Sequence, residues 1–159
     1  MPKRILVATD FSDTADAAFD YAVELAKQLG AKITVLHAYD LPVYGFPSGA
    51  LVAPVEMATR IMTAAQQALE SSCKQRANRG VEITPVVTQG PAWEEVHRVA
   101  QEQDADLIVI GTHGRKGLSR ALLGSIAEKI IRTATRPVLT IHGVHEATTK
   151  SEKPAHAHA

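Results

Sequence analysis

The chain has a single cysteine, no long hydrophobic run and no excess of either charge. One thiol, Cys73, cannot form an intrachain disulfide, which is typical of proteins from a reducing compartment. No apolar stretch approaches the roughly 20 residues that a transmembrane helix needs. The apolar segment that follows Lys3 and Arg4 is too short for a secretory signal. We therefore expect a cytoplasmic protein without a membrane partner.

The balance of charge argues against a nucleic-acid partner. Lysine plus arginine number 17, and aspartate plus glutamate also number 17. Proteins that bind duplex nucleic acid usually carry a basic surface, which a chain without net charge does not suggest. The 159 residues, of which 45% are hydrophobic, suffice for one domain with a substantial core.

Two familiar phosphate-binding signatures, the P-loop and the dinucleotide fingerprint Gly-x-Gly-x-x-Gly, are also missing. In their place, Gly111-Thr112-His113-Gly114 follows the apolar run 107–110, and Gly124-Ser125 opens a helical pattern nine residues later. The run is typical of a buried parallel strand. Glycines at its end would let a ligand approach the backbone, and the free N–H groups of a helix start suit a phosphate. The pattern therefore suggests a phosphate grip with two points of contact.

The same residues have a purely structural interpretation. Gly111 and Gly114 could simply turn the chain, and Ser125 with Glu128 has the spacing of a capping box, which requires no ligand. The glycine pattern taken alone leaves both interpretations open.

Strand-like and helix-like segments alternate along the chain. We expect strands at 4–8, 32–37, 81–88, 106–110 and 137–141, and helices at 12–29, 55–78, 92–103 and from 125. Pro85 indicates that the third strand lies at an edge of the sheet. The proline- and glycine-rich segment 40–54 is expected to be a loop, long enough to serve as a lid or a partner contact. Such alternation predicts a mainly parallel sheet with helices on both faces, which binds ligands at the carboxyl ends of its strands.

The combination of Ile5-Leu6-Val7-Ala8-Thr9-Asp10-Phe11-Ser12, Gly-x2-Gly-x9-Gly-Ser and the final segment 136–141 resembles the nucleotide-binding branch of the universal stress protein family. The resemblance runs from Lys3 to about Ile141. It implies an α/β fold, a single-domain Rossmann-like, adenine nucleotide alpha hydrolase-like three-layer sandwich. Its five-stranded parallel sheet would have the order 3-2-1-4-5. The domain would span 1–143, and the polar, histidine-containing tail 144–159 is expected to be disordered.

The resemblance also implies a ligand and a set of contacts. The ligand is ATP or another adenine nucleotide, with Mg²⁺ or Mn²⁺ held mainly by the phosphates. The implied binding residues are Ala8, Thr9, Asp10, Ala38, Ile110, Gly111, His113, Gly114, Gly124, Ser125 and Ile126. Asp10 would orient a ribose hydroxyl or help to hold the metal, and the backbone of Ala38 would meet the adenine edge. A homodimer would form through the last strand, Pro137 to Ile141.

Several of these residues also have a purely structural interpretation. Asp10 or Ser12 could cap the first helix, and Ile110 and Ile126 could be core residues. His37, on an apolar strand, is interpreted as a core histidine rather than a ligand.

Three functions remain open from the sequence. The first is a non-catalytic ATP-binding stress protein whose nucleotide changes its dimer or partner contacts, with AMP or cyclic AMP as variants. The second is a slow ATPase or autophosphorylating enzyme, for which the chain offers no P-loop lysine and no catalytic-base motif. The third is an interaction module without a nucleotide, against which the complete glycine set argues. We favour the first, with no catalytic residues.

Overall fold

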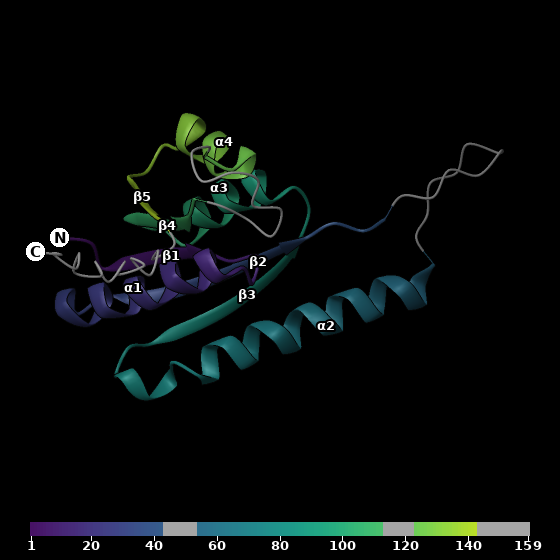
Figure 1. Ribbon diagram of the computed structural model, residues 1–159, viewed down its shortest axis with the longest axis horizontal. Coiled ribbons are helices and arrows are strands. Elements are labelled where there is room, and N and C mark those ends of the chain that lie inside the picture. Colours follow the sequence, from purple (N-terminus) through teal and green to yellow (C-terminus); the bar gives the residue numbers. More distant parts are fainter. Residues whose placement is uncertain (43–53, 113–122, 143–159) are drawn as a thin grey trace, which may run out of the picture.

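The computed structural model describes residues 1–42, 54–112 and 123–142. Five parallel strands form one sheet in the order β3-β2-β1-β4-β5, which confirms the predicted order (Figure 1). The strands are β1 Arg4–Ala8, β2 Lys32–Tyr39, β3 Ile83–Gln89, β4 Leu107–Gly111 and β5 Val138–Ile141. The helices are α1 Asp13–Leu29, α2 Val55–Lys74, α3 Ala92–Glu102 and α4 Ser125–Thr133, with a short 3-10 helix at Ala77–Arg79.

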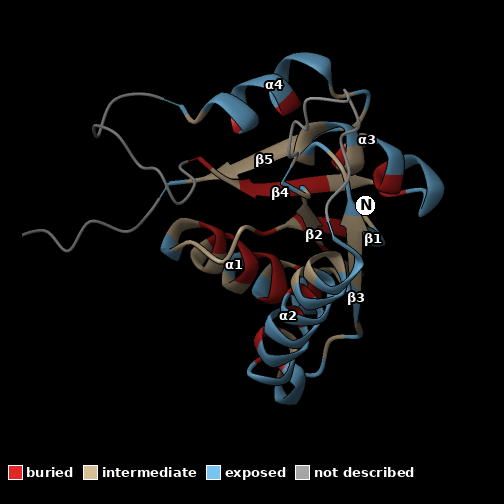
Figure 2. Cartoon of the chain, turned by 90° about the vertical axis from the view of Figure 1, so that its right-hand side faces the viewer, coloured by how far each residue is buried: buried red, intermediate tan, exposed pale blue. Residues whose placement is uncertain are grey.

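The sheet is the middle layer of three. Helices α1 and α2 cover one face and α3 and α4 cover the other, as predicted (Figure 1). Successive residues of a strand point to opposite faces, so Ile5 and Val7 of β1 pack under α1 whereas Leu6 packs under α3. All three side chains are buried, and Figure 2 shows burial concentrated along the central strands and the inner sides of the helices. A parallel strand covered on both faces needs this continuous apolar run.

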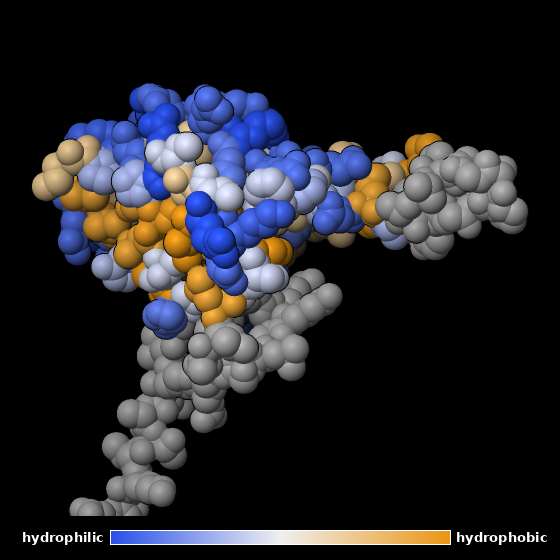
Figure 3. Space-filling view, turned by 90° about the horizontal axis from the view of Figure 1, so that it is seen from above, coloured by the Kyte–Doolittle hydropathy of each residue, from blue (hydrophilic) through white to orange (hydrophobic). Residues whose placement is uncertain are grey.

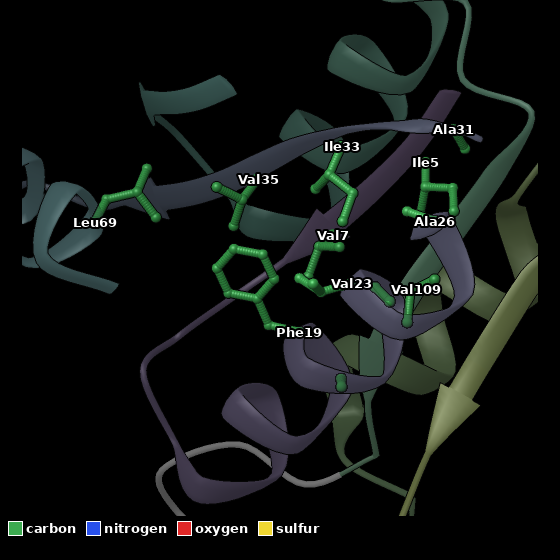
Figure 4. Close-up of a cluster of buried hydrophobic side chains, with 12 residues drawn as sticks. Ile5, Val7, Phe19, Val23, Ala26, Ala31, Ile33, Val35, Leu69 and Val109 are labelled. Carbon is green, nitrogen blue, oxygen red and sulfur yellow. The ribbon is translucent and has the colours of Figure 1, made fainter. Parts of the chain in front are cut away.

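The first hydrophobic core lies between α1 and the sheet. Phe19 and Val23 of α1 meet Val7, Val35 and other strand residues there (Figure 4). Helix α1 packs on the sheet mainly through small residues. Its small residues are buried, but Leu25 and Leu29 pack only at the margin of this core.

Local signals explain where α1 begins and ends. The Ser12 hydroxyl accepts a hydrogen bond from the Ala15 N–H at 3.3 Å, and Asp13 and Asp16 lie in the first turn, where carboxylates complement the helix dipole. Gly30 closes the helix in the left-handed conformation, with φ of 60°. Ser12 is therefore the cap, and Asp10 is not.

Some predicted boundaries were wrong. Helix α2 ends at Lys74 rather than at residue 78, and the side chain of Arg76, just beyond its end, binds back onto α1. Strand β2 runs on to Tyr39 because its far edge pairs with β3 as far as Gln89. The capping box at Ser125 is also wrong: Gly124 is the cap, and its carbonyl accepts the Glu128 N–H at 2.8 Å.

The position of the third strand agrees with the sequence. Strand β3, which contains Pro85, lies at an edge of the sheet. Cys73 is partly buried, and burial raises the pKa of its thiol. Within the three described ranges, no helix combines the length and the apolar character that crossing a membrane requires.

The amino ends of the central strands are occupied by structural contacts. The Asp106 carboxylate accepts the backbone N–H groups of Lys3 and Arg4 at 2.7 and 2.9 Å, and these bonds lower its pKa. Asp104 forms ion pairs with Arg4 and Arg136 at 2.6 and 3.1 Å. These contacts tie β1, β4 and β5 together at this edge of the sheet, and the candidate ligand site lies at the opposite edge.

Candidate functional site

The strand order reverses between β1 and β4, which pair directly. Ala8 lies opposite Ile110, so Thr9 and Asp10 leave the sheet beside Gly111. The chain continues from β1 to β2 on one side and from β4 to β5 on the other, which defines a topological switch point. Two segments far apart in the sequence therefore converge at one edge, as the sequence predicted.

The turn after β1 orients the Asp10 carboxylate. Asp10 Oδ1 accepts the Ser12 N–H at 3.0 Å, and the Thr9 hydroxyl accepts the Phe11 N–H at 3.0 Å. Phe11 has a positive φ of 61°, which is uncommon for a bulky residue. Thr9 is buried and Asp10 is half-buried, so the turn presents one carboxylate, held by its own backbone, beside the end of β4.

The backbone of Ala38 lies beyond the end of β1. Lys32 N–H donates to the Lys3 carbonyl, and Thr9 N–H donates to the Leu36 carbonyl, so even-numbered residues of β2 direct their polar groups toward β1. Ala38 shares this direction but has no β1 residue opposite it, since the last pair is Ala8 with Leu36. Its N–H and C=O thus point toward the β1 side of β2, beyond the end of β1.

Gly111 is needed for packing within the protein. A Cβ placed there would lie 2.8 Å from the backbone carbon and oxygen of Thr14 and 3.0 Å from Ala15 N. The sequence predicted that a ligand would lie close to the Gly111 backbone. In the structure, the first turn of α1 lies there instead. Ile110, next to it, is buried in the second core, in agreement with the core interpretation.

Thr112 joins β4, β5 and α4. Its N–H donates to the Ile141 carbonyl at 3.0 Å, and its carbonyl accepts the Gly124 N–H at 2.7 Å. Its hydroxyl lies 3.1 Å from His142 Nδ1 and 3.4 Å from the Ile141 carbonyl. The residue is fully buried. The start of α4 is thereby held against the end of β4.

The first turn of α4 offers backbone donors at the same edge. Ser125 and Ile126 are its first two residues, and their N–H groups have no acceptor within the helix. Ile126 is 52% exposed, so the core interpretation of this residue is wrong. His113 and Gly114 lie outside the described residues, and their predicted contacts stay predictions.

The donor set suits an anion better than a bare metal ion. It comprises backbone N–H groups and the positive end of a helix dipole, with one carboxylate nearby. Among the described residues, no group of three or more histidine, cysteine, aspartate or glutamate side chains could hold a metal. Mg²⁺ is commonly bound through one or two carboxylates together with substrate phosphates, and Asp10 fits that pattern.

The fold and the site define a doubly wound α/β domain with a candidate anion site at its switch point. Residues 1–142 match the Universal stress protein family, and the chain belongs to this family. It is 34% identical over 141 residues to the universal stress protein MJ0531 of Methanocaldococcus jannaschii, covering 87% of this chain and 81% of that protein.

Solved structures agree with this assignment. The structure of MJ0577, from the same organism, has a TM-score of 0.75 at 24% identity, covers 90% of this chain and 97% of its own, and supports the fold. A universal stress protein from Archaeoglobus fulgidus in complex with dAMP has a TM-score of 0.62 at 26% identity. The match covers 87% of this chain and 97% of that one.

Two residues at this edge are not among those that the sequence predicts for the site. Thr112 lies between the predicted glycines, and the sequence indicates a core histidine at His37. His37 is half-buried, and its Nδ1 lies 2.8 Å from the Thr9 carbonyl, in the turn that carries Asp10. The position of His37 at the end of a strand adjacent to β1 was the one available signal. The bond itself joins residues 28 positions apart and leaves no local pattern.

Proposed function

We propose that this protein binds ATP, or another adenine nucleotide, without catalysis and acts as a nucleotide-dependent regulatory factor in a stress response. The adenine would meet the backbone of Ala38, the ribose would lie by Asp10, and the phosphates would lie at Gly124 and Ser125 with the Gly-x2-Gly-x9-Gly-Ser segment. One observation carries the proposal: the 2.7 Å bond from Gly124 N–H to the Thr112 carbonyl, which brings a helix start to the switch point.

The nucleotide class is supported by a relative. The Archaeoglobus fulgidus universal stress protein that resembles this chain was solved with dAMP. ATP, AMP and cyclic AMP share its adenine, so the base-reading part of the site would be common to all of them. We infer that a Mg²⁺ or Mn²⁺ ion would be held mainly by the phosphates, with the Asp10 carboxylate as its ligand from the protein.

We further propose a homodimer through the last strand, Pro137 to Ile141. Strand β5 forms the edge of the sheet, and its residues Val138, Leu139 and Ile141 are apolar and half-buried. An apolar edge strand favours pairing with another strand. In the view from above, hydrophobic residues gather in several patches on an otherwise largely hydrophilic surface (Figure 3). Because Thr112 bonds to both Ile141 and Gly124, nucleotide at α4 could change the dimer through β5.

Substitution of Gly124 by valine should abolish the phosphate contact. The residue has φ of −60° and ψ of 144°, which valine adopts without strain, so the fold should survive. The added side chain would stand where the phosphates approach. We expect the dissociation constant for ATP to rise about 100-fold, equivalent to about 2.7 kcal/mol. Calorimetric titration with ATP and Mg²⁺ would measure it, alongside ADP, AMP and cyclic AMP.

Pro54→Val is the matched control for this substitution. Pro54 caps α2 with nearly the same backbone angles, φ of −53° and ψ of 137°, and belongs to a helix on the other face of the sheet from α4. It should leave affinity unchanged. Wild-type affinity in Gly124→Val would refute the phosphate grip. A wild-type protein that binds none of the four nucleotides would refute the proposed function.

Asp10→Asn separates the charge of this residue from its structural role. Asparagine Oδ1 can still accept the Ser12 N–H, so the turn should persist while the negative charge is lost. We expect about tenfold weaker ATP binding in the presence of Mg²⁺ and a smaller loss in its absence. Titrations with and without Mg²⁺ would show this difference. Asp13→Asn, an exposed change in the adjacent first turn of α1, should bind like wild type.

A further inference from the structure

We propose that His37 positions the adenine-reading edge of the site and thereby sets its preference for adenine over a 6-oxo purine. The inference rests on the proposed function, and it adds a residue that determines base specificity. It follows from a change in the hydrogen-bond ladder at the point where β1 leaves β2.

The last backbone hydrogen bond between β1 and β2 runs from Thr9 N–H to the Leu36 carbonyl. The regular alternation of the ladder, seen in the bonds from Lys32 N–H to Lys3 and from Thr9 N–H to Leu36, would next join Ala38 N–H to the Thr9 carbonyl. Among the described residues this bond is not made, and the Thr9 carbonyl instead meets His37 Nδ1 at 2.8 Å. The histidine side chain thus takes the place of the Ala38 backbone.

The partner atom determines the tautomer of His37. A carbonyl oxygen can only accept a hydrogen bond, so Nδ1 must carry the proton. In the neutral ring, Nε2 is then the unprotonated nitrogen. This assignment follows from the chemistry of the pair and can be checked without any ligand.

His37 makes a second contact with the turn after β1, through the ring of Phe11. The His37 ring lies against the Phe11 ring, with 4.4 Å between centroids and an interplanar angle of 38°. Phe11 has φ of 61°, a left-handed conformation that costs a non-glycine residue roughly 1–2 kcal/mol. Packing against His37 and the first core helps to offset this cost. The chain consequently turns away from β2 at Asp10 instead of continuing the strand.

The result is a donor and an acceptor on the backbone of Ala38 that fit adenine. Adenine presents an acceptor at N1 beside a donor at the 6-amino group, which match the N–H and the C=O of one residue. Hypoxanthine, in the same pose, presents a protonated N1 and a 6-oxo group, so each polar group would meet one of its own kind. Mispaired polar groups lower affinity, which gives base selectivity.

Two substitutions test the role of His37. His37→Phe keeps a ring against Phe11 but removes the donor, whereas His37→Asn places an amide N–H near the position of Nδ1. The probes are ATP, inosine triphosphate and inorganic tripolyphosphate in calorimetric titrations with Mg²⁺. For His37→Phe we expect about tenfold weaker ATP binding, a loss of the preference for ATP over inosine triphosphate, and unchanged tripolyphosphate binding. His37→Asn should restore the preference.

The outcomes separate this inference from the proposed function. If His37→Phe retains the wild-type ratio of ATP to inosine triphosphate affinity, the inference is wrong and nucleotide binding stands. If the wild-type protein binds neither nucleotide, the proposed function fails and the inference fails with it. Long-range ¹H–¹⁵N spectra of the wild-type protein at pH 8 give an independent check. A protonated Nδ1 is expected for His37, and a protonated Nε2 with bare Nδ1 would overturn the assignment even if the variants failed to fold.

Discussion

Replacement of Arg76 by alanine is expected to lower the free energy of unfolding by about 3 kcal/mol. The guanidinium links α2 to α1: Nε donates to Asp20 at 2.9 Å, and Nη1 donates to the Ser72 hydroxyl and carbonyl at 2.8 and 3.0 Å. Nη2 reaches the Asp16 carboxylate at 3.3 Å. The guanidinium also lies 4.4 Å from the centroid of the Phe19 ring, in cation–π geometry.

The size of the effect depends on the exposure of the partners. The Arg76 side chain is only 5% exposed, so its loss leaves a cavity beside Phe19 and removes several charge-assisted bonds at once. The Asp16 and Asp20 side chains are 47% and 45% exposed, and water can therefore solvate them after the substitution. This places the expected loss at the lower end of the range for a broken buried ion pair, about 3 to 5 kcal/mol.

Urea denaturation followed by circular dichroism would measure the loss, with Arg79→Ala as the control. Arg79 also pairs with α1, at 3.1 Å from Asp20 and 3.8 Å from Glu24, but its side chain is 39% exposed. Exposed ion pairs contribute little, so this variant should lose at most about 1 kcal/mol. Equal losses in the two variants would show that the burial of Arg76 has no special importance.

Gly111→Ala should destabilise the fold by about 2 kcal/mol although it adds a single methyl group. The new Cβ would lie 2.8 Å from backbone atoms of Thr14, and backbone in a packed helix cannot move aside as the end of a flexible side chain can. Helix α1 would have to shift away from β4, and the turn that carries Asp10 would move with it. We therefore also expect weaker ATP binding.

Gly80→Ala provides the comparison for Gly111. Gly80 has φ of 77° and no atom within 4 Å of an added Cβ, so its cost is backbone strain alone, about 1 kcal/mol, without an effect on ATP binding. Unfolding in urea would rank the two variants. A Gly111→Ala protein as stable as wild type would mean that α1 can accommodate the added methyl group at no cost in stability. The glycine would then be explained by ligand approach, as the sequence first suggested.

Much of the fold could be predicted from the sequence because its signals are local. Ser12 and Gly30 delimit α1 through bonds within one or two turns, and Pro85 identified an edge strand because it lacks an N–H. The buried strand before Gly111 was recognised from its continuous apolar run. The strand order came from family resemblance, since spacing along the chain does not specify which strands become neighbours.

The candidate site was predictable only in part. Asp10 comes just after the first strand, and Gly124 comes just before the last helix. Both positions can be read from the sequence. The tertiary structure decided the rest. It placed the first turn of α1 against Gly111, paired His37 with the Thr9 carbonyl, and bound Arg76 to α1. These contacts join residues that are remote in the chain. The energies of these contacts depend on distances in space, and the periodicity of apolar residues along the chain does not specify those distances. The sequence by itself thus determined the elements and the kind of site, and packing decided which residues hold that site in shape.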